Sequence, residues 1–165
     1  MMLSEILSHE FAHEATATRR MLERLPADRL DWRPHPKSFT ARGLASHIVE
    51  CLNLTDEILN QDGFDIDPAT YPRYMATSVD DLLEHFDERV ARSQRALAAV
   101  ADADLGQLWS FKVMGRERWQ KPKIAVLRDL MLSHLIHHRG QLSVYLRLLD
   151  VPVPGSYGPT ADEQK

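Results

Sequence analysis

The chain has 165 residues, a length at which a single domain buries about 70% of the surface that its unfolded chain exposes. Hydrophobic residues make up 44% of the sequence and charged residues 27%, and the formal net charge is −4 with the basic residues dispersed. These values are typical of a globular protein and exclude the clustered positive charge of a nucleic-acid-binding surface. We expect one domain over residues 1–165 and no nucleic-acid partner.

Targeting signals are the next property that the sequence addresses. Residues 1–5 lack the basic region and apolar run of a signal peptide, and no apolar stretch approaches the ~20 residues that cross a bilayer. Cys51 is the single cysteine, which rules out an internal disulfide and suits a reducing compartment. We therefore expect a cytoplasmic protein without a membrane partner.

Hydrophobic periodicity predicts four helices. The first covers residues 3–25, where apolar residues recur every three or four positions until Pro26 ends the helix. The second covers residues 41–60, with Ser38 or Thr40 as its N-cap and an Asp-Gly pair as its stop signal.

The remaining two helices follow the same pattern. The third starts after Ser78, whose hydroxyl can cap it, and its apolar stripe reaches Val100. The fourth covers residues 123–149, between Pro122 and a proline-rich segment. Together they predict an all-α four-helix bundle. Its connections are long, about 15 to 20 residues against the usual ~2–8, so the order of the helices in the bundle is left open.

The last connection carries aromatic residues that a simple linker does not need. Residues 108–119 contain Trp109, Phe111 and Trp119 around a Met-Gly pair. This segment is interpreted either as a short hairpin or as an irregular flap that packs its aromatic side chains on the bundle.

Histidines four residues apart lie one turn apart on the same face of a helix, so His134 and His138 can direct two imidazoles at one point. At about 100° per residue both fall on an apolar seam of the fourth helix. His47 falls on the matching seam of the second helix. The two seams are Leu127, Met131, His134, His138, Gln141, Tyr145 and Leu148, and Leu44, His47, Cys51, Leu54 and Ile58.

The other histidines provide a comparison within the same chain. His9 and His13 are also four apart, yet they lie opposite the apolar stripe of the first helix, and His137 flanks its seam. Burying an imidazole without a partner costs on the order of 1–3 kcal/mol. Three inward histidines therefore favour a shared metal ion, and three protein ligands leave a position open for water or substrate.

Three further residues have alternative interpretations. Cys51, one turn after His47, is either a zinc ligand or a small buried hydrophobic residue, and the second is favoured. Glu14 is a hydrogen-bond partner of a metal ligand, a proton carrier, or a residue at the end of the core whose carboxylate reaches solvent, and the last is favoured. Tyr145 is a second catalytic candidate, or a wall of the pocket together with Trp32 and Tyr157.

Four separated motifs resemble those of the DinB/YfiT-like superfamily, the damage-inducible proteins that are unrelated to the DNA polymerase of the same name. They lie at residues 30–38, 44–48, 134–141 and 148–159, in the family's order. The resemblance implies a four-helix bundle with a divalent metal held by His47, His134 and His138. Cys51 stands where the family usually has an apolar residue.

The resemblance also implies a class of chemistry. Family members with assigned activity include transferases that use small bacterial thiols such as bacillithiol, and mycothiol-dependent isomerases. We therefore expect a metal-dependent enzyme that transfers a low-molecular-weight thiol to an electrophile, with zinc or nickel favoured over iron or manganese. The alternatives are a metal-dependent hydrolase, with Glu14 as its general base, and a non-catalytic, stress-related metal-binding dimer.

A homodimer is expected from the far side of the fourth helix. Leu132 and Ile136 lie opposite the histidine seam, with Leu146 part-way round. A helix in a bundle needs only one apolar stripe, and a second one commonly marks a partner surface. The alternative is that a crossing loop covers these residues.

Overall fold

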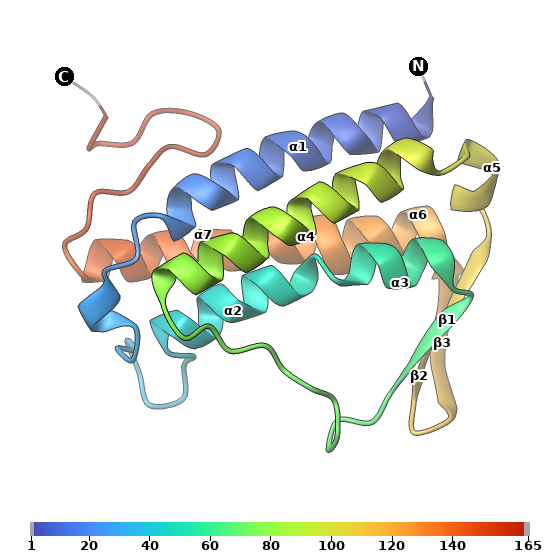
Figure 1. Ribbon diagram of the computed structural model, residues 1–165, viewed down its shortest axis with the longest axis horizontal. Coiled ribbons are helices and arrows are strands. Elements are labelled where there is room, and N and C mark those ends of the chain that lie inside the picture. The colour runs from blue at the N-terminus through green and yellow to red at the C-terminus, as the bar shows by residue number, and fades with distance from the viewer. Residues whose placement is uncertain (1, 164–165) are drawn as a thin grey trace.

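The structure is a computed structural model that describes residues 2–163, most of them helical (Figure 1). Four helical rods lie side by side. The rod formed by α1 packs on the α4 rod and on the α7 rod, and the α2 rod packs on the same two. The rods are α1 (Leu3–Leu22), α2 (Ala41–Cys51) continued by α3 (Leu54–Asn60), α4 (Val79–Ala99), and the run α6 (Lys123–Val126), η2 (Leu127–Ser133) and α7 (His134–Leu148).

Two helix starts agree with the capping signals in the sequence. The Thr40 hydroxyl accepts a hydrogen bond from the Gly43 amide at 3.0 Å, so Thr40 rather than Ser38 caps α2. The Ser78 hydroxyl accepts from the Asp81 amide at 3.1 Å at the start of α4. Side-chain oxygens at these positions satisfy amides that lack a partner within the helix.

The second predicted helix is interrupted at Leu52 and Asn53. The backbone here makes bonds three residues back, including Asn53 N–H to the Glu50 carbonyl at 3.0 Å. The buried Leu52 carbonyl accepts from the Ser93 hydroxyl of α4 at 3.3 Å. A side chain from a neighbouring helix thus forms a hydrogen bond with a backbone carbonyl at the interruption. The pattern of apolar residues does not predict this break in the helix.

The fourth predicted helix contains a π-helical segment, η2, directly before His134. A π-turn holds more residues than an α-turn, so it changes the face that the following residues present. The buried face of α7 is centred on Leu135, Leu142 and Leu146, while Gln141 and Leu148 of the predicted seam are exposed. The predicted seam was therefore rotated from the true one.

This rotation removes the basis of the dimer prediction. Leu132 and Leu146 are 1% and 0% exposed within the chain itself, and Ile136 is half-buried. The second apolar strip is therefore part of the core rather than a free surface. The homodimer stays a prediction without that support.

A three-stranded sheet corrects the all-α expectation. Its strands are β1 (Gly63–Ile66), β2 (Leu108–Val113) and β3 (Arg116–Pro122), in the order β1-β2-β3. The predicted hairpin is confirmed as β2 and β3, which pair antiparallel around Met114 and Gly115, both with positive φ. β1 adds in parallel to β2, with Gly63 opposite Ser110.

Segments outside the four rods form hydrogen bonds with the ends of α1. Asp102, on the short helix α5 (Asp102–Leu105), accepts from the amides of Leu3 and Ser4 at 2.8 and 2.9 Å. After α7 the chain returns past α1, where Arg20 donates to the Gly155 carbonyl at 2.8 Å. None of the helices within residues 2–163 is both long and apolar enough to span a membrane.

Candidate metal centre

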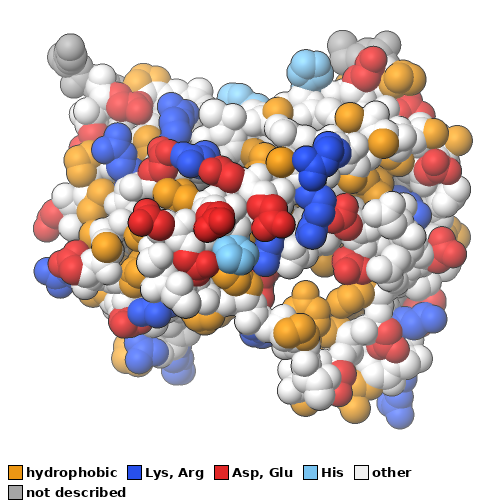
Figure 2. Space-filling view, viewed as in Figure 1, with side chains coloured by type: hydrophobic (Ala, Val, Ile, Leu, Met, Phe, Trp, Pro, Cys, Tyr) orange, Lys and Arg blue, Asp and Glu red, His pale blue; other side chains and the backbone are white. Residues whose placement is uncertain are grey.

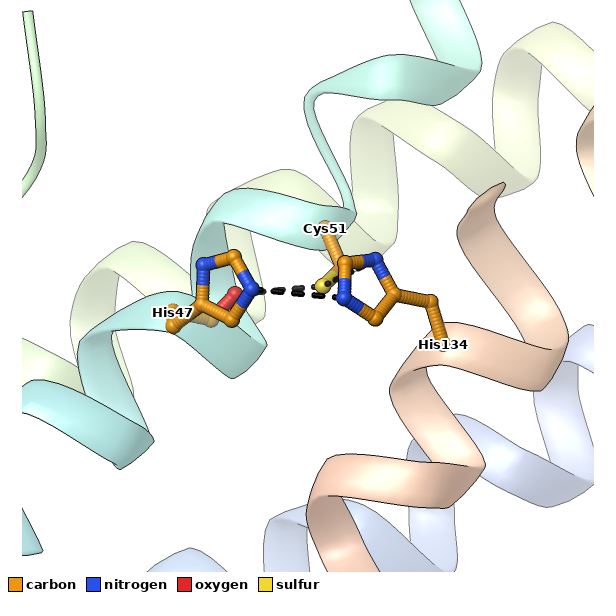
Figure 3. A group of neighbouring side chains, drawn as sticks. All are labelled: His47, Cys51 and His134. Atoms are coloured by element: carbon orange, nitrogen blue, oxygen red, sulfur yellow. Dashed lines mark hydrogen bonds between the residues drawn. The ribbon is translucent and has the colours of Figure 1, made fainter. Parts of the chain in front are cut away.

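Two histidines from different helices face each other (Figure 3). His47 lies on α2 and His134 begins α7, and their Nε2 atoms are 3.3 Å apart. Cys51, one turn after His47, places its Sγ 3.6 Å from Nδ1 of His134. One ligand atom from each of the three lies within 4.8 Å of the others, so the described residues contain a His/Cys/His group suited to a metal ion.

His138 lies beside this group. Its ring centroid is 4.6 Å from those of both His47 and His134. Its Nδ1 donates to Oε1 of Gln141 at 2.7 Å, which leaves Nε2 with a lone pair. That Nε2 is buried and has no hydrogen-bond partner among the described residues. Burying such an atom without a partner costs about 1–3 kcal/mol of folding free energy, and a bond to a metal ion would remove this cost.

The other two histidines are also held by neighbouring groups. His47 Nδ1 donates to Oε2 of Glu50 at 3.2 Å, and His134 bonds the Leu130 carbonyl. Metal-binding histidines are oriented in this way by a carboxylate or a carbonyl. The Nε2 atoms of His47 and His134 face each other at 3.3 Å, a separation that fits a hydrogen bond between the two rings and equally two ligands of one ion. Two nitrogen ligands on tetrahedral zinc, with bonds of about 2.0–2.1 Å, lie about 3.3–3.4 Å apart.

The electrostatics favour neutral imidazoles. Burial lowers the pKa of His138 to about 4, although the hydrogen bond that His138 donates to Gln141 raises it. Burial also lowers the pKa of His134, and the neighbouring His47 lowers it further. A protonated imidazole cannot bind a metal, so these shifts keep the ligand form present at neutral pH.

Cys51 is buried, as expected of a small apolar residue, yet it also belongs to the His/Cys/His group. Its thiol donates to the His47 carbonyl at 3.2 Å, and burial raises its pKa to about 12. The family resemblance gave no reason to expect this cysteine to take part in such a group. Its place follows from the four-residue spacing to His47.

An apolar cavity of about 220 Å³ opens beside His47, Cys51 and His134. The face of the molecule that shows the sheet is hollowed between the helices and the strands, next to hydrophobic side chains (Figure 2). The aromatic residues of the hairpin form part of the cavity wall, as expected for a flap. Its aromatic lining comes from Phe64, Tyr71, Trp109 and Phe111.

A second cavity of about 340 Å³ lies on the side of His138. Tyr145 lines it and donates from its hydroxyl to the Phe39 carbonyl at 3.0 Å. Phe39 stacks on His47 with 5.9 Å between ring centroids, and Trp32 packs edge-on against Tyr145 at 5.6 Å. Tyr145 therefore lies close to the centre with its hydroxyl already engaged.

Glu14, the other catalytic candidate, lies elsewhere. Its carboxylate forms a buried ion pair with Arg139 at 2.6 Å and accepts from the Tyr157 hydroxyl at 3.0 Å. None of these three residues lines either cavity at the histidines. The carboxylate that does lie there is Glu50, which the sequence reading missed. Its position three residues after His47 was the available signal, because such residues share a helix face.

The fold and the site define a mostly helical protein with a His/Cys/His group suited to a metal ion beside an apolar cavity. The sequence model of the DinB superfamily matches residues 10–142, and the chain belongs to that superfamily.

Relatives in Bacillus subtilis strain 168 cover most of the chain. YjoA is 24% identical over 147 residues, which are 87% of this chain and 88% of YjoA. YrdA is 28% identical over 152 residues, 91% of this chain and 85% of YrdA. Among solved structures, a DinB-like protein from Bacillus cereus aligns with a TM-score of 0.74 at 26% identity, covering 93% of this chain and 97% of that one. The YjoA structure aligns with a TM-score of 0.69 at 19% identity, covering 96% and 98%.

Proposed function

We propose that this chain is a metal-dependent enzyme on a four-helix bundle of the DinB type, which transfers a low-molecular-weight thiol to an electrophilic substrate. His47, His134 and His138 would hold a divalent ion through their Nε2 atoms. The observation that supports this most is the buried Nε2 of His138, which has no partner among residues 2–163 and adjoins two other imidazoles.

Zinc or nickel suits this donor set best, with iron or manganese as further choices, because imidazole is a ligand of intermediate softness. Three protein ligands leave room for one more. Cys51 is the nearest further donor, although its thiol bonds the His47 carbonyl. The three-histidine set is preferred because Glu50 and Gln141 already hold the Nδ1 atoms of His47 and His138, which directs their Nε2 atoms to the ion.

The chemistry would divide between the ion and the chain. When bound, a divalent ion supplies the positive charge that lowers the pKa of a thiol and favours its nucleophilic thiolate. Glu50 and Gln141 hold the imidazoles of His47 and His138 in place. The aromatic walls of the 220 Å³ cavity exclude water and give an apolar electrophile a surface to bind next to the thiol.

A metal-dependent hydrolase is the second candidate, and Glu50 favours it because this carboxylate lines the cavity beside His47. A hydrolase needs such a group as a general base. Both Glu50 oxygens are engaged, however, by His47 and by the Tyr74 amide at 2.8 Å. Thiol transfer ranks first because it needs no carboxylate base.

The test combines metal content with activity. Metal-loaded protein is incubated with a panel of low-molecular-weight thiols and monochlorobimane, and with ester substrates in parallel. We expect bimane transfer that a chelator abolishes and zinc or nickel restores. His47→Ala, His134→Ala and His138→Ala should each lose most of the bound metal by elemental analysis and the activity with it. His9→Ala, His13→Ala and His137→Ala are matched controls, because these three side chains are exposed.

The outcomes separate the alternatives. Full metal retention in His134→Ala would reject the proposed ligands. Ester hydrolysis without bimane transfer would favour the hydrolase. Bound metal with neither activity, together with a dimer by light scattering, would favour the non-catalytic role.

A further inference from the structure

The segment between β1 and α4, residues 67–78, runs from the sheet back to the start of α4 and is called the strap here (Figure 1). Its second half is tied to α2, since the Tyr74 amide donates to Oε1 of Glu50 at 2.8 Å and the Ala76 amide to the Ser46 hydroxyl at 2.9 Å. Tyr71 and Arg73 of the strap line the cavity. The strap therefore presents these two side chains at a fixed place beside the candidate metal centre.

Arg73 is the one cationic side chain of the cavity wall. Within residues 2–163 no carboxylate lies within 4.0 Å of its guanidinium. Glu50, the anionic side chain of the same wall, has both oxygens engaged by His47 and by the Tyr74 amide. The cavity thus offers a positive charge, on an exposed side chain, that forms no ion pair with the described residues.

The rest of the wall suits a flat ring. A cavity of about 150 Å³ lined by aliphatic and aromatic residues holds benzene, and this one measures about 220 Å³. Phe64 and Tyr71 meet edge-to-face at 5.9 Å, and Phe111 stacks on Trp119 at 5.2 Å. Such walls bind a ring through its face and its edge, in addition to the area that it buries.

We propose that the electrophile of this enzyme is an apolar, ring-bearing molecule with an anionic group, and that Arg73 determines this specificity by binding the anion. The inference rests on the proposed function, because it takes the occupant of the cavity to be the electrophile. The ring lies against the aromatic walls. The anion lies at Arg73, whose planar guanidinium can pair with both oxygens of a carboxylate.

Two probes of one shape test the proposal by calorimetry: 1-naphthoate, which is anionic, and 1-naphthamide, which is neutral. We expect the zinc-loaded protein and the chelator-treated protein both to bind naphthoate more tightly. Arg73→Gln should lower the affinity for naphthoate about three- to tenfold, the range for a charged pair that is partly exposed. The affinity for naphthamide should change less than twofold. Arg73→Lys should retain part of the preference. Arg118→Gln is the matched control, because Arg118 is an exposed arginine of β3 outside the cavity.

Three results would overturn the proposal: equal affinity for the two probes, binding of neither, or a naphthoate preference that survives Arg73→Gln. If that surviving preference disappears on metal removal, the ion binds the carboxylate and Arg73 does not. Failure of the proposed function has a different signature, namely absent bimane transfer while Arg73 still governs naphthoate binding. Thermal unfolding of each variant shows that it is folded.

Discussion

Each imidazole of the candidate centre depends on a different neighbour for its orientation. Gln141 accepts from His138 Nδ1 at 2.7 Å, and Glu50 accepts from His47 Nδ1 at 3.2 Å. These partners choose the ring nitrogen that remains free to bind a metal. Residues that contact no ion can therefore control its affinity.

Gln141→Leu tests this dependence. The substitution keeps similar bulk but removes the acceptor of His138 Nδ1, so the ring loses its fixed orientation. We expect zinc affinity to fall about 10–100-fold, the usual effect of losing such a partner. Competition with a chromogenic chelator measures it. Gln61→Leu is the control, since Gln61 is exposed and bonds only Glu57. A change below twofold in Gln141→Leu would contradict the role.

The sequence predicts the histidines better than their surroundings. His47, His134 and His138 come together because four-residue spacing on one helix and one histidine on a neighbouring helix leave few other arrangements. The burial of a charged residue is harder to predict, because hydrophobicity patterns assign charged residues to the surface. Arg139 is 2% exposed and pairs with Glu14, so a charged side chain lies on the buried face of α7, outside the predicted seam.

At the scale of elements, the boundaries that sequence reasoning missed are those set by distant partners. The interruption between α2 and α3 depends on Ser93, 41 residues beyond Leu52. The parallel pairing of β1 with β2 joins Gly63 to Ser110. In contrast, the starts of α2 and α4 were predictable, because their caps are local.

The start of α1 has a distant cap, and this leads to a prediction on pH. The amides of Ser4 and Leu3 donate to the Asp102 carboxylate and hold its pKa below the usual value. Since the folded pKa is the lower one, the stabilisation is complete above the unfolded pKa and is lost as the pH falls through the folded pKa. Asp102→Ala should therefore lower the Tm at pH 7, and the difference from wild type should shrink below about pH 4.

Two further variants make this test specific. Asp104→Ala, on the same short helix, removes a half-buried carboxylate whose side chain accepts from the nearby Gln107, and it should leave the Tm nearly unchanged. Asp102→Asn keeps one acceptor oxygen without a titratable group, so its effect on the Tm should depend less on pH. A Tm difference for Asp102→Ala that stays constant from pH 7 into the acid range would contradict the assignment to the carboxylate.

At the scale of the whole molecule, the cavity is built from segments that are remote in sequence. Its lining comes from α2, α3, β1, the strap, β2, η2 and α7, as in Leu54, Ile66, Phe111 and Leu130. Periodicity predicted the rods and the inward histidines. It could not predict this cavity, because a four-residue strand and a strap without regular structure carry no periodic signal.

The two hydrogen bonds of Glu50 have a thermodynamic consequence. One Glu50 oxygen orients His47 and the other holds the strap at Tyr74. A metal bound by His47 and a ligand bound against the strap would therefore both stabilise the same conformation of Glu50. Binding at the two places should then be cooperative and reciprocal, with each ligand raising the affinity of the other by the same factor. The neutral 1-naphthamide reports it without direct attraction to the ion. We expect a coupling factor of about five or more, which calorimetry measures in both orders of addition and which falls to about one in Glu50→Ala. A factor unchanged by that substitution would mean that the two sites communicate by another route.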